Sequence, residues 1–136
     1  MSSEMEKAYR HALMRLAEHV GVSADALLQS EELTIDGVPV GLSLDGDTEG
    51  DPVIQVFCAV GVIPGNDAAH VYRELLRANA FGVDTQGATF GMQHGADRVV
   101  LAQKLGADAE TQTLAETMRH LAHLAHAWQR QLGLQA

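Results

Sequence analysis

Three groups of side chains in this sequence have the chemical types needed for metal binding or nucleophilic catalysis. The first is the acidic segment 45–51, which begins like a calcium-binding loop with oxygen ligands at alternate positions. Its residues at the first, third, fifth and sixth loop positions are Asp45, Asp47, Glu49 and Gly50. The twelfth position needs a bidentate glutamate and holds Val56, and the segment joins two expected strands rather than two helices. We therefore interpret it as a solvated loop and expect no metal there.

The second group is a row of histidines near the end of the chain, and the third is a single cysteine. His120, His123 and His126 recur every three residues, a spacing at which helix neighbours can share a metal. They span a broad arc and no carboxylate or cysteine completes a ligand set nearby, so we interpret them as a solvated helix face. Cys58 with a distant histidine would be a nucleophile and its base. It lies among apolar strand residues without a basic neighbour, whereas reactive cysteines occupy exposed electropositive settings.

No phosphate-binding loop or dinucleotide fingerprint is present either. We therefore expect no catalytic residue, no metal and no cofactor. A small enzyme remains an alternative interpretation, but the missing set of catalytic residues disfavours it.

Length and composition indicate one globular domain spanning residues 1–136. Hydrophobic residues make up 46% of the chain, but aromatic residues only 4%, so aliphatic side chains must build the core. The longest apolar run, 56–63, is far shorter than the roughly 20 residues of a membrane helix. The first residues lack the pattern of a signal peptide, and one cysteine excludes an intrachain disulfide. We expect a cytoplasmic protein that does not associate with membranes.

The charge distribution bears on the partner. The net charge is −9, and no Lys or Arg occurs between Leu16 and Tyr72. An acidic surface of this kind repels phosphate backbones, so we expect no nucleic-acid partner. It favours a protein partner with neutral or basic segments, although solubility alone explains most of these acids.

Apolar periodicity predicts an α+β domain in which three helices pack on a twisted, mostly antiparallel sheet. The expected order is α-β-β-β-α-β-β-α. The segments are helix 4–20, ended by Gly21, with one further turn at 23–28; hairpin 33–44; central strand 53–63; helix 66–82; strands 88–92 and 98–104; and a last helix capped by Asp108. In the last helix, the expected buried face is Leu114, Met118, Leu121, Ala125, Trp128 and Leu132.

The first hairpin can be predicted in register. Asp36-Gly37 is a favoured two-residue turn, so Ile35 faces Val38 and the apolar residues of both strands share one face. Pro39 lacks an N–H and is tolerated at a strand edge better than in a sheet centre. We therefore expect the second strand of the hairpin to have an open edge near Pro39.

Helix 66–82 carries adjacent leucines, Leu75 and Leu76, which widen its apolar stripe beyond one core-facing side. Such a stripe on a short chain suggests that one side of the helix meets its own core and another side meets a second molecule. The stretches 75–81, 87–89 and 99–101, followed by a long helix with Trp128 near its end, resemble the Tir-chaperone family, the class I chaperones of bacterial type III secretion. The resemblance is strongest over about residues 53–132.

The resemblance implies a cytoplasmic bacterial homodimer that holds the N-terminal region of a secreted effector, a virulence protein, in an extended, secretion-competent state. By resemblance, helix 66–82 and the following strand form the dimer interface, for which we expect Val71, Leu75, Ala78, Phe81, Phe90 and Met92. For effector binding we expect Leu13, Leu16, Ile35, Val40, Leu42 and Leu44. The alternative is a regulatory or small-molecule-binding module of the same fold outside secretion.

Overall fold

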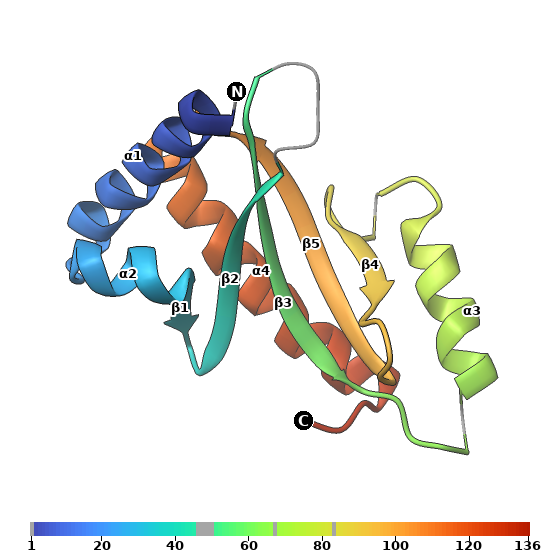
Figure 1. The fold of residues 1–136 in the computed structure, drawn as a ribbon. Coiled ribbons are helices and arrows are strands. Elements are labelled where there is room, and N and C mark those ends of the chain that lie inside the picture. The colour runs from blue at the N-terminus through green and yellow to red at the C-terminus, as the bar shows by residue number, and fades with distance from the viewer. Residues whose placement is uncertain (1, 46–50, 67, 83) are drawn as a thin grey trace.

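The computed structural model describes residues 2–45, 51–66, 68–82 and 84–136. Five antiparallel strands form one sheet in the order β1-β2-β3-β5-β4, and four helices pack around it (Figure 1). The elements are α1 (Ser2–Val20), α2 (Ala24–Ser30), β1 (Glu32–Ile35), β2 (Val38–Asp45), β3 (Val53–Val62), α3 (Ala68–Asn79), β4 (Thr89–Met92), β5 (Arg98–Gly106) and α4 (Thr111–Leu132). No helix in these described segments is long and apolar enough to cross a membrane.

The helices cover one face of the sheet and lie at both of its sides. Helix α4 runs across the face formed by β2, β3 and β5, and α1 packs against α4 and α2 at the β1 side (Figure 1). Helix α3 lies beside β4 at the opposite side (Figure 1). The core therefore forms between α4 and the strand side chains that point toward it: Met118 of α4, Val56 of β3 and Leu101 of β5 are fully buried.

The expected fold class is confirmed, with one addition. The segment after Gly21 forms a complete short helix, α2, rather than one further turn. Ser23 accepts the Ala26 N–H at the start of α2, and Glu31 ends it in the left-handed region with a φ of 52°. A favourable cap at each end stabilises a helix of only seven residues.

The first hairpin has the predicted register. Ile35 pairs with Val38 and Leu33 with Val40, around a turn in which Asp36 and Gly37 both have positive φ. This backbone geometry matches the twist of the flanking strands and suits an Asp-Gly pair. The predicted face is also found, because its six apolar residues are buried or half-buried.

Two expectations about edges and ends are corrected, and one about the central strand is confirmed. Strand β2 lies inside the sheet, between β1 and β3, so Pro39 is not on an outer edge; it lies just beyond the last β2–β3 pair, Val40 with Cys58. Strand β3 is central as predicted, but the described helices cover only one of its faces, and Phe57 on the other face is 37% exposed. The residue at the start of α4 is Glu110 rather than Asp108, because residues 106–109 form a separate turn closed by the Ala109 N–H and the Gly106 carbonyl.

Candidate partner-binding site

The candidate binding surface is a small apolar cavity where the end of α1, strand β1 and the first half of α4 meet. Its volume is about 210 Å³. Its lining residues are Leu16, Val20, Val22, Leu33, Thr34, Ile35, Ala115, Met118 and Arg119. We call this space the α1–β1 cavity. Leu16 and Met118 are fully buried, whereas Val20 and Val22 remain 40% and 43% exposed. The cavity is therefore open to solvent through apolar side chains, which disfavours water inside it and favours an apolar ligand group.

An unpaired strand edge borders the α1–β1 cavity. Strand β1 is the last strand on this side of the sheet, so one of its edges has no strand neighbour among the described residues. The Leu42 N–H donates to the Glu31 carbonyl over 2.9 Å, which fixes the alternation of hydrogen-bonding groups along β1. By that alternation the backbone groups of Glu32 and Thr34 point outward. The Glu32 carbonyl accepts the Ser30 hydroxyl over 3.2 Å, and Thr34 offers its N–H and C=O at the cavity rim.

Glu31 fixes the position of β1 relative to the helices. Its N–H donates to the Leu27 carbonyl over 2.8 Å, and its carboxylate accepts the hydroxyl of Tyr9 on α1. Burial, together with the hydrogen bond and the negative charge of Glu31, raises the pKa of Tyr9 above its ordinary value. Tyr9 therefore stays a neutral donor, and α1, α2 and β1 are joined at a single residue.

The structure places the six expected partner-binding residues in two groups. Leu13, Leu16, Val40 and Leu42 have at most 2% of their surface exposed and belong to the core of the single chain. Of these four, Leu16 forms the buried floor of the α1–β1 cavity. Ile35 and Leu44 are half-buried, and Ile35 lines the same cavity.

Sequence reasoning did not select several residues of this cavity. Val20, Val22, Leu33 and Met118 line it. Leu33 could have been found, because it shares the hairpin face with Ile35. Val20 and Val22 flank Gly21, so they could have been recognised as apolar residues at the end of a helix. The contribution of Met118 depends on contacts between α4 and α1, which local periodicity does not contain.

The six expected dimer residues also divide into buried and exposed. Val71, Leu75 and Ala78 point from α3 into the core, and Phe90 packs edge-on against Trp128 with ring centroids 5.1 Å apart. Phe81 is 92% exposed and Met92 is 38% exposed.

Two further apolar side chains of α3 belong to the exposed surface. Tyr72 is 40% exposed and Leu76 is 71% exposed, although neither was among the expected dimer residues. Asn79 holds α3 against β4, because its side-chain amide donates to the Phe90 carbonyl over 3.0 Å and accepts the Phe90 N–H over 2.8 Å. We call Tyr72, Leu76, Phe81 and Met92 the α3–β4 patch.

Of the groups that suggested metal binding or catalysis, some make structural contacts and some lie outside the described residues. No cluster of three metal-ligating side chains is found in the part of the chain that the structure describes. Asp45 forms an ion pair of 3.0 Å with Lys104, while Asp47, Glu49 and Gly50 lie outside the described residues. His126 contacts the Asp36 carbonyl through Nε2 at 3.1 Å.

Cys58 is a buried thiol. It is 1% exposed, and its Sγ lies 3.7 Å from the Leu121 carbonyl, which accepts a weak hydrogen bond from it. Burial raises the pKa of this thiol to about 11. A thiol of this kind is protonated at neutral pH and has little nucleophilic character.

Comparison with protein families decides the class of protein to which this fold belongs. The model of the Tir chaperone protein (CesT) family matches residues 30–129, which is more than half of the chain. The chain belongs to the Tir chaperone family. The expected resemblance is therefore confirmed, and the matched region includes β1 and most of α4, two of the three elements that form the α1–β1 cavity.

Several solved structures share this fold. The crystal structure of the ExsC-ExsE complex has a TM-score of 0.66 and 20% identity, covering 90% of this chain and 92% of that chain. The HopA1-SchA chaperone-effector complex has a TM-score of 0.68 and 13% identity, covering 90% and 94%. The Yersinia pestis type III secretion chaperone SycH, in complex with a stable fragment of YscM2, has a TM-score of 0.60 and 20% identity, covering 86% and 96%. No curated protein sequence matches the chain significantly.

Proposed function

We propose that this member of the Tir chaperone family is a bacterial cytoplasmic type III secretion chaperone that binds the N-terminal region of an effector in an extended state. The observation that carries the proposal is the α1–β1 cavity beside the open edge of β1. An extended effector segment would form backbone hydrogen bonds with Thr34 and insert an apolar side chain between Val20, Val22 and Ile35. This binding mode needs neither a cofactor nor ATP.

The surroundings of the cavity suit a neutral or basic segment. Glu32 is exposed next to Leu33 of the cavity lining, and Arg119 is the one cation among the described residues that line it. Most of the binding energy would come from apolar contact and backbone pairing, because exposed charges are screened at physiological salt. Raising the salt concentration should therefore change effector affinity only modestly.

A homodimer is part of the proposal, and its interface is the α3–β4 patch. Several exposed large apolar residues on neighbouring elements of a small domain commonly mark an interaction surface. Leu76 and Phe81 are the most exposed large apolar side chains that the structure describes. Of the expected interface residues, Val71, Leu75, Ala78 and Phe90 would support this surface from beneath, while Phe81 and Met92 would contact the second copy.

The experiment compares two aspartate variants of α1. Val20→Asp places a charge at the α1–β1 cavity, and Met14→Asp places the same charge on α1 at a residue that does not line this cavity. The two side chains are similarly exposed, at 40% and 45%, so both variants should fold. The probe is a tagged N-terminal segment of the effector encoded beside the chaperone gene, titrated by calorimetry.

We expect Val20→Asp to weaken binding of this segment at least about tenfold, because a charge must be desolvated in the apolar contact. Met14→Asp should bind like the unmodified chain. Equal binding by the two folded variants would show that the effector does not use the α1–β1 cavity. A chain that binds no effector segment, but is stabilised by a small molecule, would support the alternative of a ligand-binding module.

A further inference from the structure

The ladder between β2 and β3 ends before β3 does. Its last pair is Val40 with Cys58, although β3 continues to Val62. The next residue of β2 beyond this pair is Pro39, which precedes Val40 in the chain. Pro39 has no N–H to donate, so β2 cannot continue the regular ladder there. Strand β3 also carries an irregularity between Ala59 and Gly61, where its register with β5 shifts by one residue. The last residues of β3 therefore lie inside the sheet but lack a β2 partner in the described ladder.

A segment from the end of the chain pairs with this part of β3. The Val62 N–H donates to the Gln135 carbonyl over 2.7 Å, and the Gln135 N–H donates to the Val62 carbonyl over 2.9 Å. The pair is antiparallel, so the segment after α4 runs as a short extra strand beside β3. Leu134 anchors this segment with only 8% of its surface exposed. We call residues 134–136 the tail strand.

Gly61 makes the close approach of the tail strand possible. A Cβ atom at Gly61 would lie 2.7 Å from the Gln135 carbonyl oxygen and 2.7 Å from the Leu134 Cβ. Backbone cannot yield to such a contact as a flexible side chain can. A side chain at position 61 is therefore incompatible with the seated tail strand.

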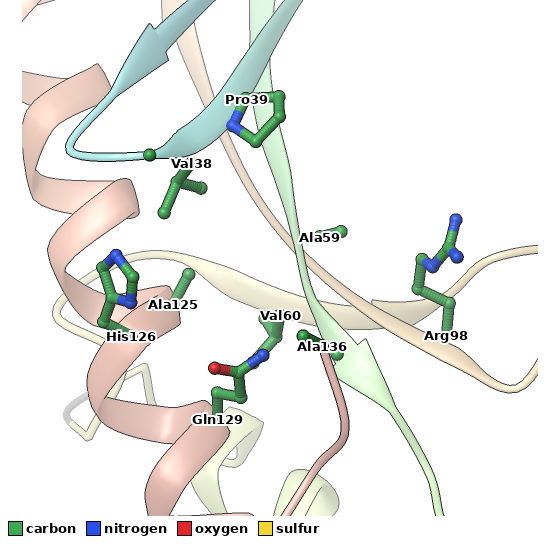
Figure 2. A pocket seen from close by; sticks show the side chains of 11 residues that line it. Val38, Pro39, Ala59, Val60, Arg98, Ala125, His126, Gln129 and Ala136 are labelled. Carbon is green, nitrogen blue, oxygen red and sulfur yellow. The ribbon is translucent and has the colours of Figure 1, made fainter.

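A cavity of about 310 Å³ continues from the tail strand toward Pro39. Figure 2 shows Val38, Val60 and Ala125 on its apolar side, with His126 and Gln129 of α4 beside them. Ala136 reaches the cavity next to Val60, but its methyl group is much smaller than this space (Figure 2). A strand in the position of the tail strand, with a larger apolar side chain at this point, would occupy more of the cavity and gain contact area.

We propose that the edge of β3 from the level of Pro39 on β2 to Val62 is a second strand-addition site. It would take an apolar extended segment of the effector, and the tail strand holds it closed. The inference rests on the proposed chaperone function and adds to it a site on a different strand edge, that of β3 instead of β1. The tail strand shows that extended backbone fits this edge in antiparallel orientation. An effector segment would replace its two hydrogen bonds with Val62 and place an aliphatic side chain between Val38, Val60 and Ala125.

The tail strand and the effector segment would compete for one edge. An intramolecular competitor lowers the apparent affinity by the fraction of molecules in which the edge is open. Releasing the tail strand should therefore tighten effector binding, and seating it more firmly should weaken binding. These opposite effects distinguish a closed binding site from a tail that only completes the fold.

Two variants release the tail strand, and each has a matched control. Gly61→Ala introduces the clashing Cβ, whereas Gly65→Ala makes the same change where a Cβ meets nothing within 4 Å. Gln135→Pro removes the backbone N–H that donates to the Val62 carbonyl, whereas Gln135→Ala keeps this N–H. Hydrogen exchange of the Val62 amide reports release directly. We expect it to accelerate at least about tenfold in Gly61→Ala and Gln135→Pro, and to stay slow in both controls.

The availability of the edge can be tested without an effector. A synthetic peptide with the sequence of residues 129–136, added at millimolar concentration to the Gln135→Pro chain, should slow exchange at Val62 again by pairing in trans. The same peptide should leave the unmodified chain unchanged, because its own tail strand occupies the edge. Fast exchange that persists in the presence of the peptide would overturn the assignment of this edge as a strand-addition site.

The effector arm uses the tagged N-terminal segment described above. Gln135→Pro should bind it at least about tenfold more tightly than Gln135→Ala. Ala136→Leu, which extends a larger apolar side chain from the tail strand into the 310 Å³ cavity, should bind it more weakly. Equal affinities in the three chains would refute the second site while leaving effector binding at β1 intact. Loss of binding in Val20→Asp but not in Met14→Asp tests the β1 site separately, so failure of one proposal is distinguishable from failure of the other.

Discussion

Adjacent leucines on α3 should respond in opposite ways to the same substitution. Leu75 is 6% exposed and points into the core, whereas Leu76 is 71% exposed and belongs to the α3–β4 patch. Leu75→Ala should lower the free energy of unfolding by about 2–5 kcal/mol, as removal of a buried leucine side chain does. Leu76→Ala should leave the stability of the single chain within about 0.5 kcal/mol of the unmodified protein.

Dimerisation should depend on Leu76 instead. A fully buried leucine contributes about 1.5–3 kcal/mol, so covering the 71% of Leu76 that is exposed would contribute about 1–2 kcal/mol per protomer. Two protomers double this contribution to about 2–4 kcal/mol. Leu76→Ala should therefore weaken the dimer by roughly 30- to 1,000-fold.

Sedimentation velocity over a concentration series measures the dimer dissociation constant, and urea denaturation at low protein concentration measures the stability of the single chain. Leu76→Asp provides a stronger perturbation of the same contact, because it would place an unpaired charge in the interface. An unmodified chain that is monomeric at micromolar concentration would refute the proposed dimer. A Leu76→Asp chain that dimerises normally would refute the α3–β4 patch as its interface.

The buried thiol and one close contact in the sheet give two further predictions. Cys58 has its pKa raised to about 11 from an ordinary value of 9.0, so a thiol reagent at pH 8 should modify it only after denaturation. Between these pH values the folded chain holds the proton that the unfolded chain loses, so this thiol should lower the free energy of unfolding as the pH rises from 9 to 11. Urea denaturation of the unmodified chain and of Cys58→Ala measures this contribution. An equal pH dependence of stability in the two chains would contradict the pKa shift. Gly41→Ala would place a Cβ 2.5 Å from the ring of Phe57, its partner on β3, and should lower the melting temperature through a loss of about 1–3 kcal/mol. Gly65→Ala is the control, and equal melting temperatures would show that the ring of Phe57 moves aside without cost.

The sequence by itself determined the elements and much of their pairing. Asp36-Gly37 prefers one turn type, and the alternation of apolar residues around it allows one register, so the hairpin could be predicted residue by residue. Helical periodicity likewise identified the buried face of α4, from Leu114 to Leu132, and all six residues of that stripe are buried. These features depend on short-range geometry, which a sequence contains directly.

Only the tertiary structure decided which apolar residues are core and which form surface. Ile35 and Val40 share a hairpin face, yet Val40 is buried while Ile35 borders an open cavity, because the surrounding helices enclose only part of that face. Leu75 and Leu76 are adjacent in sequence and separated by the orientation of α3 against β4. The backbone pairing of Gln135 with Val62 joins residues that are 73 positions apart in the sequence. Periodicity states which residues share a face, but coverage of that face depends on distant segments, which only the packed chain brings together.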